Sequence, residues 1–287
     1  MIRKLKIILE MIKFEHTVFA LPFAFLGAIL GSQIVEGTWP TLMEWVWITL
    51  AMVGARSAAM SLNRVIDAQI DKKNPRTATR AIPAGLISKL EILVFILASF
   101  VVLFFAAYQL NLLAVYLLPV AVFFLVIYSY TKRFTWACHL ILGMTIGLAP
   151  LGGWVGATGT LTWEAVVLFI GVALWTAGFD VIYATQDADY DRDVGLYSIP
   201  SRFGIARSLL LAKLFHVISF IALVSMFVIT PLGWVYLIGV VIAGAIMVYE
   251  HSLVSADDLS KVGVAFFTMN GILSVVMFIF TIGDFLL

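Results

Sequence analysis

Residues 63–71 read Asn63-Arg-Val-Ile-Asp67-Ala-Gln-Ile-Asp71 and directly follow an apolar run, 42–62. A second acidic stretch lies at the end of another apolar run, 165–183, and reads Asp180-Val-Ile-Tyr-Ala-Thr-Gln-Asp187-Ala-Asp189-Tyr-Asp191-Arg-Asp193. An apolar run of about 20 residues is long enough to cross a bilayer as a helix. The two stretches therefore predict a helical membrane protein with an acidic cluster at the end of two of its spans.

The composition of the whole chain supports a membrane protein. Apolar residues make up 62% of its 287 residues and charged residues 12%, whereas soluble domains have about 45–50% and about 25%. This excludes an ordinary soluble fold and intrinsic disorder. Nine apolar runs are long enough to span a bilayer, so we expect an all-α polytopic protein with transmembrane helices near 17–35, 42–62, 92–108, 112–130, 137–155, 165–183, 208–229, 232–249 and 262–285.

The distribution of lysine and arginine predicts how these helices are oriented. Basic residues precede the first helix and follow the second, fourth, sixth and eighth, whereas the opposite loops, around Gly37, Gln109, Gly159 and Pro231, carry none. Positive charge marks the cytoplasmic side. We therefore expect an inner (cytoplasmic) membrane protein with its N-terminus and acidic clusters in the cytoplasm and its C-terminus outside. Residues 1–13 form a basic amphipathic segment that we expect on the membrane surface.

The layout of the chain predicts a single domain, 1–287. The two acidic stretches stand four helices apart and share their spacing, which favours two four-helix halves of parallel repeats plus a ninth helix around a central cavity. The single cysteine, Cys138, excludes an intrachain disulfide. A net charge of +1 gives no bulk attraction for nucleic acid, so we expect no nucleic-acid partner.

The spacing within the two acidic stretches predicts a metal site. Asn63, Asp67 and Asp71 are spaced i, i+4, i+8 and would project from one helical face, and Asp187 and Asp191 repeat the spacing. Carboxylates stacked in this way repel one another and require a compensating cation. Their ligands are all oxygen, with no histidine or cysteine among them, which fits Mg²⁺ with Mn²⁺ as the alternative. These five residues are the predicted metal ligands, and the four aspartates are the predicted catalytic residues.

The basic residues around these clusters indicate the substrate. Mg²⁺ held by a few carboxylates usually completes its coordination with water and phosphate oxygens. Arginine and lysine bind a diphosphate and stabilise it as a leaving group. The sequence therefore predicts a lipid diphosphate, handled at the cytoplasmic mouth of the helical bundle.

Three further side chains are weaker candidates, each with an alternative role. Arg56 lies deeper on the helical stripe of Asn63, where it would either bind an anionic substrate group or pair with Asp180. Tyr183 lies at the predicted cytoplasmic interface. It would either belong to an interfacial aromatic belt or stabilise a cation, and the sequence favours neither role. The isolated histidines of the chain receive no predicted role: His139, His216 and His251.

The paired motifs on nine helices resemble the UbiA superfamily of intramembrane prenyltransferases, and the likeness spans nearly the whole chain. Other stretches that carry the resemblance are 71–85 (Asp-Lys-Lys-Asn-Pro-Arg-Thr-Ala-Thr-Arg-Ala-Ile-Pro-Ala-Gly), 128–133 (Tyr-Ser-Tyr-Thr-Lys-Arg) and 195–204 (Gly-Leu-Tyr-Ser-Ile-Pro-Ser-Arg-Phe-Gly). The chain looks most like the 4-hydroxybenzoate polyprenyltransferase branch. Residues 15–24 and 183–192 also resemble the menaquinone-pathway relatives of that branch.

The resemblance implies an aromatic polyprenyltransferase. In the family, the two motifs hold Mg²⁺ on the diphosphate of a polyprenyl donor, and departure of the diphosphate leaves an allylic cation. An electron-rich ring carbon of a small aromatic acid then attacks, and a base removes the ring proton. Carried over by position, the metal and diphosphate ligands are Asn63, Asp67, Asp71, Asp187 and Asp191. The implied contacts to the diphosphate or to the acceptor carboxylate are Arg76, Lys132, Arg133 and Arg202.

Several alternatives stay open at this point. Asp189 and Asp193 form a second i, i+4 pair, so the carboxylate that accepts the proton is not assigned. The acceptor could be 4-hydroxybenzoate, a dihydroxynaphthoate or a tetrapyrrole side chain. A CDP-alcohol phosphotransferase also uses intramembrane aspartates, but its DGxxAR core is absent. The alternative that is not an enzyme is an ion-coupled transporter. Acidic clusters at the membrane border, rather than at its midplane, disfavour a transporter.

Overall fold

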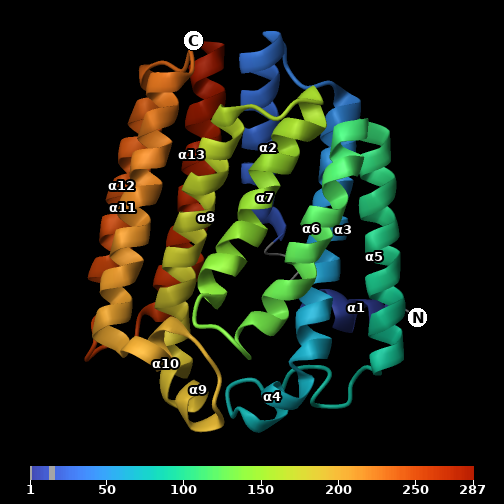
Figure 1. Ribbon diagram of the computed structural model, residues 1–287, viewed down its shortest axis with the longest axis vertical. Coiled ribbons are helices and arrows are strands. Elements are labelled where there is room, and N and C mark those ends of the chain that lie inside the picture. The colour runs from blue at the N-terminus through green and yellow to red at the C-terminus, as the bar shows by residue number, and fades with distance from the viewer. Residues whose placement is uncertain (1, 13–16) are drawn as a thin grey trace.

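The computed structural model describes residues 2–12 and 17–287, and the described part is all-helical, without strands. Its helices run mostly parallel to one long axis, with short helices α4, α9 and α10 together at one end, which we call the motif end (Figure 1). The C-terminus lies at the opposite end of the bundle. In order, the helices are α1 (Ile2–Met11), α2 (Thr17–Gly31), α3 (Leu42–Ile66), α4 (Ala68–Lys73), α5 (Lys89–Leu110), α6 (Leu112–Thr131), α7 (Cys138–Thr158), α8 (Trp163–Ala184), α9 (Ala188–Val194), α10 (Ile199–Phe203), α11 (Ile205–Ile229), α12 (Trp234–Ser252) and α13 (Asn270–Leu286).

Three short segments of tighter or wider helix extend these elements. A π-helical turn, Ser32–Glu36, continues α2, and another, Val264–Met269, precedes α13. A 3₁₀ turn, Thr185–Asp187, joins α8 to α9. Single π turns inside α-helices are frequent near functional sites.

Eight helices of the described chain are long and apolar enough to cross a membrane. A ninth apolar helix, Leu21–Glu36, is shorter, and it includes most of the first predicted span. The predicted all-α membrane fold is therefore confirmed, whereas the predicted count of nine spans is not reached by length and composition alone.

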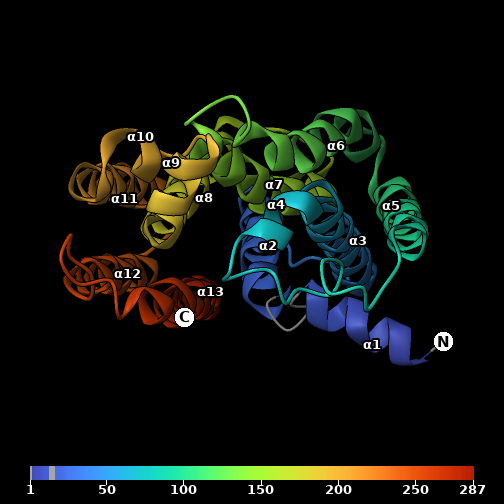
Figure 2. The ribbon, with the colours of Figure 1, turned by 90° about the horizontal axis from the view of Figure 1, so that it is seen from below.

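The two predicted halves meet where glycines let α2 and α7 approach closely. A Cβ added to Gly27 would lie 1.9 Å from the carbonyl oxygen of Pro150, and one added to Gly153 would lie 1.9 Å from that of Ala24. Small residues at a helix–helix contact allow this approach in membrane proteins, where van der Waals packing drives association. α2 also contacts α13, so α2 joins the first half of the bundle to the second (Figure 2).

The amphipathic N-terminal segment packs against the bundle. Ile8, Met11 and Ile12 are buried in one cluster with Ile87 and Ile92, near the start of α5. Lys4 forms an ion pair with Glu91. Residues 1 and 13, which belong to the predicted surface segment, and residues 14–16, which precede the first predicted span, lie outside the described residues.

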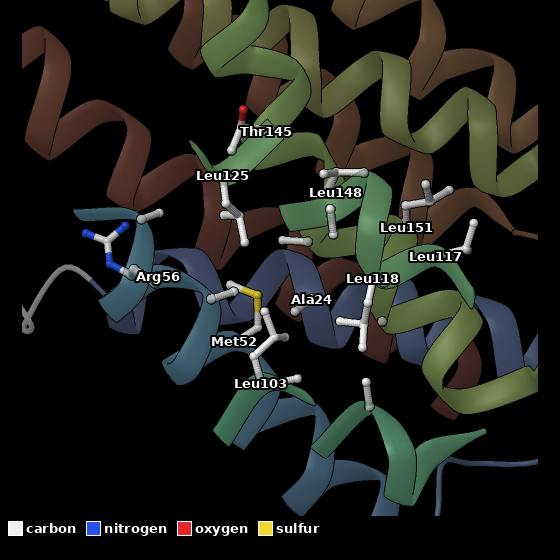
Figure 3. Close-up of a pocket in the computed structure, with 18 of the residues that line it drawn as sticks. Ala24, Met52, Arg56, Leu103, Leu117, Leu118, Leu125, Thr145, Leu148 and Leu151 are labelled. Carbon is white, nitrogen blue, oxygen red and sulfur yellow. The ribbon is translucent and has the colours of Figure 1, made fainter. Parts of the chain in front are cut away.

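The cavity of the bundle lies between the helices of the first half and α7, the first long helix of the second half. It has a volume of about 280 Å³ and is enclosed by α2, α3, α5, α6 and α7. Its walls are almost wholly apolar, and Arg56 is the charged side chain at one end (Figure 3). Along α3 the lining residues extend from Ile48 to Met60, about 18 Å at 1.5 Å per residue.

Candidate active site

Asp67 and Asp187 occupy equivalent places in the two halves. Each stands at a junction between a long helix and a short one: Asp67 between α3 and α4, and Asp187 between the 3₁₀ turn after α8 and α9. Their backbones share one conformation, φ −88°, ψ 0° at Asp67 and φ −104°, ψ 6° at Asp187. This sparsely populated region recurs at active-site residues. The α-helix is thus interrupted at both aspartates, although Asn63 and Asp67 still lie one turn apart with their side chains in contact.

The carboxylate of Asp67 is buried and bound by three neighbours. Asn63 donates to its Oδ2 from one turn earlier on α3, at 3.1 Å. Lys132 and Arg133, at the end of α6, form ion pairs with its two oxygens. Arg133 also donates to the carbonyl oxygen of Ile66 at 2.9 Å. The end of α6 is thereby fixed to the end of α3.

Asp71 lies on α4 and is also buried. NH1 of Arg80 donates to both of its oxygens, at 2.7 and 2.8 Å. The hydroxyl of Thr77 donates to the Asp71 carbonyl at 3.1 Å, which fixes the loop that carries Arg80. A buried carboxylate is stable only when paired and hydrogen-bonded, and Arg80 meets this requirement here.

Asp187 is held by the loop that follows α4 in the other half of the chain. Arg76 donates from Nε to Oδ1 at 2.9 Å and contacts Oδ2 through NH2, and Asn74 Nδ2 donates to Oδ1 at 3.2 Å. Burial of the guanidinium disfavours its charge, yet the Asp187 carboxylate raises the pKa of Arg76 above its ordinary value. Arg76 also donates to the Tyr183 hydroxyl at 3.1 Å. The loop that follows the first acidic motif is therefore joined to the second motif through Arg76.

Asp191 and Asp180 complete the acidic cluster at the motif end. Asp191 interacts electrostatically with Asp187, Lys132 and His139. Asp180 Oδ2 lies 2.6 Å from His139 Nδ1 on α7. His139 Nε2 accepts a hydrogen bond from the Ile199 backbone N–H, so Nδ1 carries the proton that faces Asp180. His139 was thus wrongly left without a role, and nothing in its sequence surroundings pointed to α8.

An aromatic stack places Tyr183 beside the acidic cluster. The ring of Phe266, in the π-helical turn before α13, lies 4.1 Å from the Tyr183 ring between centroids. Asn270 donates to the carbonyls of Ala265 and Phe266 and so stabilises this turn. No sequence pattern indicates this contact, because Phe266 lies within an uninterrupted apolar run.

The remaining predicted residues lie around the acidic cluster. Arg56 lines the apolar cavity, two turns before Asn63 on α3. Arg202 lies exposed on α10, and no hydrogen bond or ion pair joins its side chain to a carboxylate of the described residues. The alternative pair, Asp189 and Asp193, is also exposed, and Asp189 pairs with Arg192.

The oxygen-rich cluster is compatible with Mg²⁺. Within the described residues, no three acidic, histidine or cysteine side chains come close enough to share one ion. Mg²⁺, however, is usually held by one or two carboxylates, with water and substrate phosphates supplying the other ligands. Each motif contains two aspartates one helical turn apart in the sequence, Asp67 with Asp71 and Asp187 with Asp191.

Comparisons with known proteins agree with this fold. The model of the UbiA prenyltransferase family matches residues 20–276. The 4-hydroxybenzoate octaprenyltransferase of Vibrio cholerae serotype O1 is 29% identical over 231 residues, 80% of this chain and 81% of that protein. The apo structure of a UbiA homolog from Aeropyrum pernix K1 is 30% identical, covers 94% of this chain and 98% of that one, and has a TM-score of 0.85.

A UbiA homolog from Archaeoglobus fulgidus, solved bound to GPP and Mg²⁺, has the same fold, with a TM-score of 0.75 at 16% identity over 98% of this chain and 100% of that one. Fold and site together define an integral membrane enzyme with two acidic motifs at one end of a helical bundle. The chain belongs to the UbiA prenyltransferase family, and it is a prenyl-transferring enzyme. The resemblance seen in the sequence is confirmed.

Proposed function

We propose that the chain transfers a polyprenyl group from a polyprenyl diphosphate to a small aromatic acid, 4-hydroxybenzoate, in the biosynthesis of a respiratory quinone. The observation that carries the proposal is the joining of both acidic motifs, through Arg76 and Asp187, beside an apolar cavity. The Vibrio relative named for 4-hydroxybenzoate supports this acceptor.

The apolar cavity suits the prenyl chain of the donor. Its wall on α3 ends at Met60, one turn before Asn63, so a chain lying in the cavity brings its diphosphate to the acidic cluster. The apolar walls also exclude water, which would otherwise capture the allylic cation. A donor longer than the cavity would extend its tail into the surrounding bilayer.

The charged residues of the cluster suit the diphosphate. Asn63, Asp67, Asp71, Asp187 and Asp191 are the proposed metal ligands, with Mg²⁺ favoured over Mn²⁺. When bound, the metal supplies positive charge to the diphosphate and favours its departure. Arg76, Lys132 and Arg133, which bind the carboxylates in this structure, are placed to bind phosphate oxygens as well.

The reaction balances without a further reactant. The C–O bond of the donor breaks, and the diphosphate leaves with the electron pair. A ring carbon of the acceptor forms the new C–C bond, and its proton passes to a carboxylate of the cluster. Arg56, at the end of the cavity nearest the cluster, is the proposed contact of the acceptor carboxylate. Tyr183 and Asp180 belong to the proposed site through their contacts with Arg76 and His139.

We further propose an inner-membrane location with the motif end in the cytoplasm and the C-terminus outside. The support is the one-sided distribution of lysine and arginine. A reporter fused after Leu287 should then read as extracytoplasmic and one inserted near Lys73 as cytoplasmic. Both reporters on one side would contradict this topology.

The function is tested by offering alternative acceptors side by side. Purified protein in detergent receives a polyprenyl diphosphate and Mg²⁺ with 4-hydroxybenzoate, a dihydroxynaphthoate or no acceptor, and the prenylated products are identified by mass. Prenylated 4-hydroxybenzoate as the main product would support the proposal. Prenylation of the dihydroxynaphthoate alone would reassign the acceptor, and no product with any acceptor would overturn it.

A further inference from the structure

A second cavity, remote from the acidic motifs, lies between α11 and α12 and forms a groove. These two helices stand at one edge of the bundle (Figure 1). The groove has a volume of about 630 Å³. Val217, Val241 and Val248, all exposed, form part of an apolar wall. The Phe220 ring packs on Gly244, where an added Cβ would lie 2.6 Å from the ring. The absence of a side chain at Gly244 therefore lets the ring lie against α12. Lys213, His251 and Ser252 form its polar end, on the side of the acidic motifs.

Two histidines at this polar end form a directed hydrogen-bond chain. His216 Nε2 lies 3.1 Å from the Trp175 carbonyl oxygen, which can only accept, so this nitrogen carries the proton. His216 Nδ1 is then an acceptor, and it lies 3.0 Å from His251 Nε2, which must donate. The remaining nitrogen, His251 Nδ1, is therefore an acceptor as well.

His251 Nδ1 has no hydrogen-bond partner among the described residues, although the atom is buried. A buried acceptor without a donor costs free energy, which a donor supplied by a ligand would recover. The Ser252 hydroxyl does not supply that donor, because it donates to the Tyr249 carbonyl at 2.6 Å. Because His251 lines the groove, this unused acceptor belongs to its polar end.

Lys213 adds a positive charge next to this acceptor. It is exposed, interacts electrostatically with His251, and lies about 12 Å along α11 from Ile205. A lysine on the lipid-facing side of a span attracts an anion, and basic pockets between transmembrane helices on the cytoplasmic side bind anionic lipid headgroups.

We propose that this groove binds an anionic phospholipid whose headgroup carries a free hydroxyl, as a phosphatidylglycerol does. The lipid phosphate pairs with Lys213, a headgroup hydroxyl donates to His251 Nδ1, and one acyl chain lies along the valine wall. A choline headgroup has no N–H or O–H to donate and carries a cation that Lys213 repels. The proposal is independent of the prenyl-transfer reaction.

The test uses three lipids with identical acyl chains, offered to the delipidated protein and quantified as retained lipid by native mass spectrometry. The headgroup of phosphatidylglycerol has a net negative charge and hydroxyl groups, and that of phosphatidylmethanol has the net negative charge alone. The headgroup of phosphatidylcholine has no net charge and no hydroxyl. Wild-type protein should retain them in that order. Equal retention of phosphatidylglycerol and phosphatidylcholine would overturn the proposal.

Two variants separate the two contacts. Lys213→Gln should lower phosphatidylglycerol retention about fivefold, because one lysine near an anionic lipid surface strengthens binding by about that factor. His251→Phe should abolish the difference between phosphatidylglycerol and phosphatidylmethanol while both still exceed phosphatidylcholine. Lys261→Gln, in the loop before α13, is the matched control and should retain lipids as wild type does. Wild-type selectivity in Lys213→Gln, which changes an exposed side chain and leaves the core intact, would contradict the proposal even if His251→Phe failed to fold.

Discussion

The guanidinium of Arg76 binds the carboxylate of Asp187, 111 residues later in the chain, with Nε 2.9 Å from Oδ1. Arg76 follows the first acidic motif and Asp187 opens the second, so one ion pair closes the site across the two halves of the bundle. Tyr183, one turn before Asp187, shares the same guanidinium. Displacement of this arginine onto a phosphate oxygen would leave Asp187 available to a metal ion.

Replacement of Asp187 should therefore be far more damaging than replacement of its exposed neighbour Asp189. Asp187→Asn removes charge at the site, and loss of one such electrostatic element commonly lowers the rate about 10²–10³-fold. Asp189 is 88% exposed in its side chain and pairs with Arg192, so Asp189→Asn should leave the rate nearly unchanged. Diphosphate release by both variants at saturating Mg²⁺ measures the difference, and similar rates would refute the assignment of Asp187.

Removal of divalent metal should abolish prenyl transfer without unfolding the protein. The lysines and arginines of the site already compensate the carboxylates, so the fold does not depend on the metal. We expect no turnover in excess chelator, an unfolding temperature within a few degrees of that of the metal-loaded protein, and full recovery on adding Mg²⁺. Turnover that persists in the chelator would contradict metal-assisted departure of the diphosphate.

A larger side chain in the cavity should shorten the donor that the enzyme accepts. Ala51 lines the cavity on α3, so Ala51→Phe should raise KM for long polyprenyl diphosphates and leave a five-carbon donor unaffected. Ala98→Phe, on an exposed face of α5, is the control and should change KM for neither the long donors nor the five-carbon donor. Equal effects on long and short donors would show that the chain lies elsewhere.

Two adjacent glycines of α7 should respond oppositely to the same change. Gly153→Ala places a Cβ 1.9 Å from the Ala24 carbonyl, and overpacking of this kind costs about 1–3 kcal/mol. A Cβ at Gly152 meets nothing within 4 Å, so Gly152→Ala should be neutral or slightly stabilising. Thermal unfolding in detergent compares them, and equal unfolding temperatures would contradict the close contact of α2 with α7.

Most of the fold could be predicted because apolar run length alone identifies membrane spans. The predicted span 112–130 differs by one residue from α6, and 92–108 lies within α5. The breaks at Asp67 and Asp187 could not be predicted, since i, i+4 spacing alone favours a continuous helix. A cavity within the bundle could be expected, but the helices that enclose it, α2, α3, α5 and α6 together with α7, follow from side-chain packing.

The residue types of the site could be predicted, but their pairing could not. The i, i+4 spacing identifies the carboxylates of the site. The lysines and arginines that lie near them in the sequence are identified as the basic side chains of the same site. That Arg76 crosses to Asp187, and that His139 binds Asp180, depends on how α4, α7 and α8 converge in space. Arg202 was expected at the site through its place in a familiar motif, yet α10 leaves it exposed.

The central claim, that both motifs act on one diphosphate, is tested most directly by combining a substitution from each. Asp67→Asn and Asp191→Asn are made singly and together, with Asp257→Asn as a control in a loop outside both motifs, and diphosphate release is measured at saturating Mg²⁺. Residues that act as one unit are non-additive, so each single variant should lose about 10²–10³-fold and the double variant little more than the worse single one. Near-normal turnover in either single variant, or a double loss equal to the product of the two, would contradict a shared substrate.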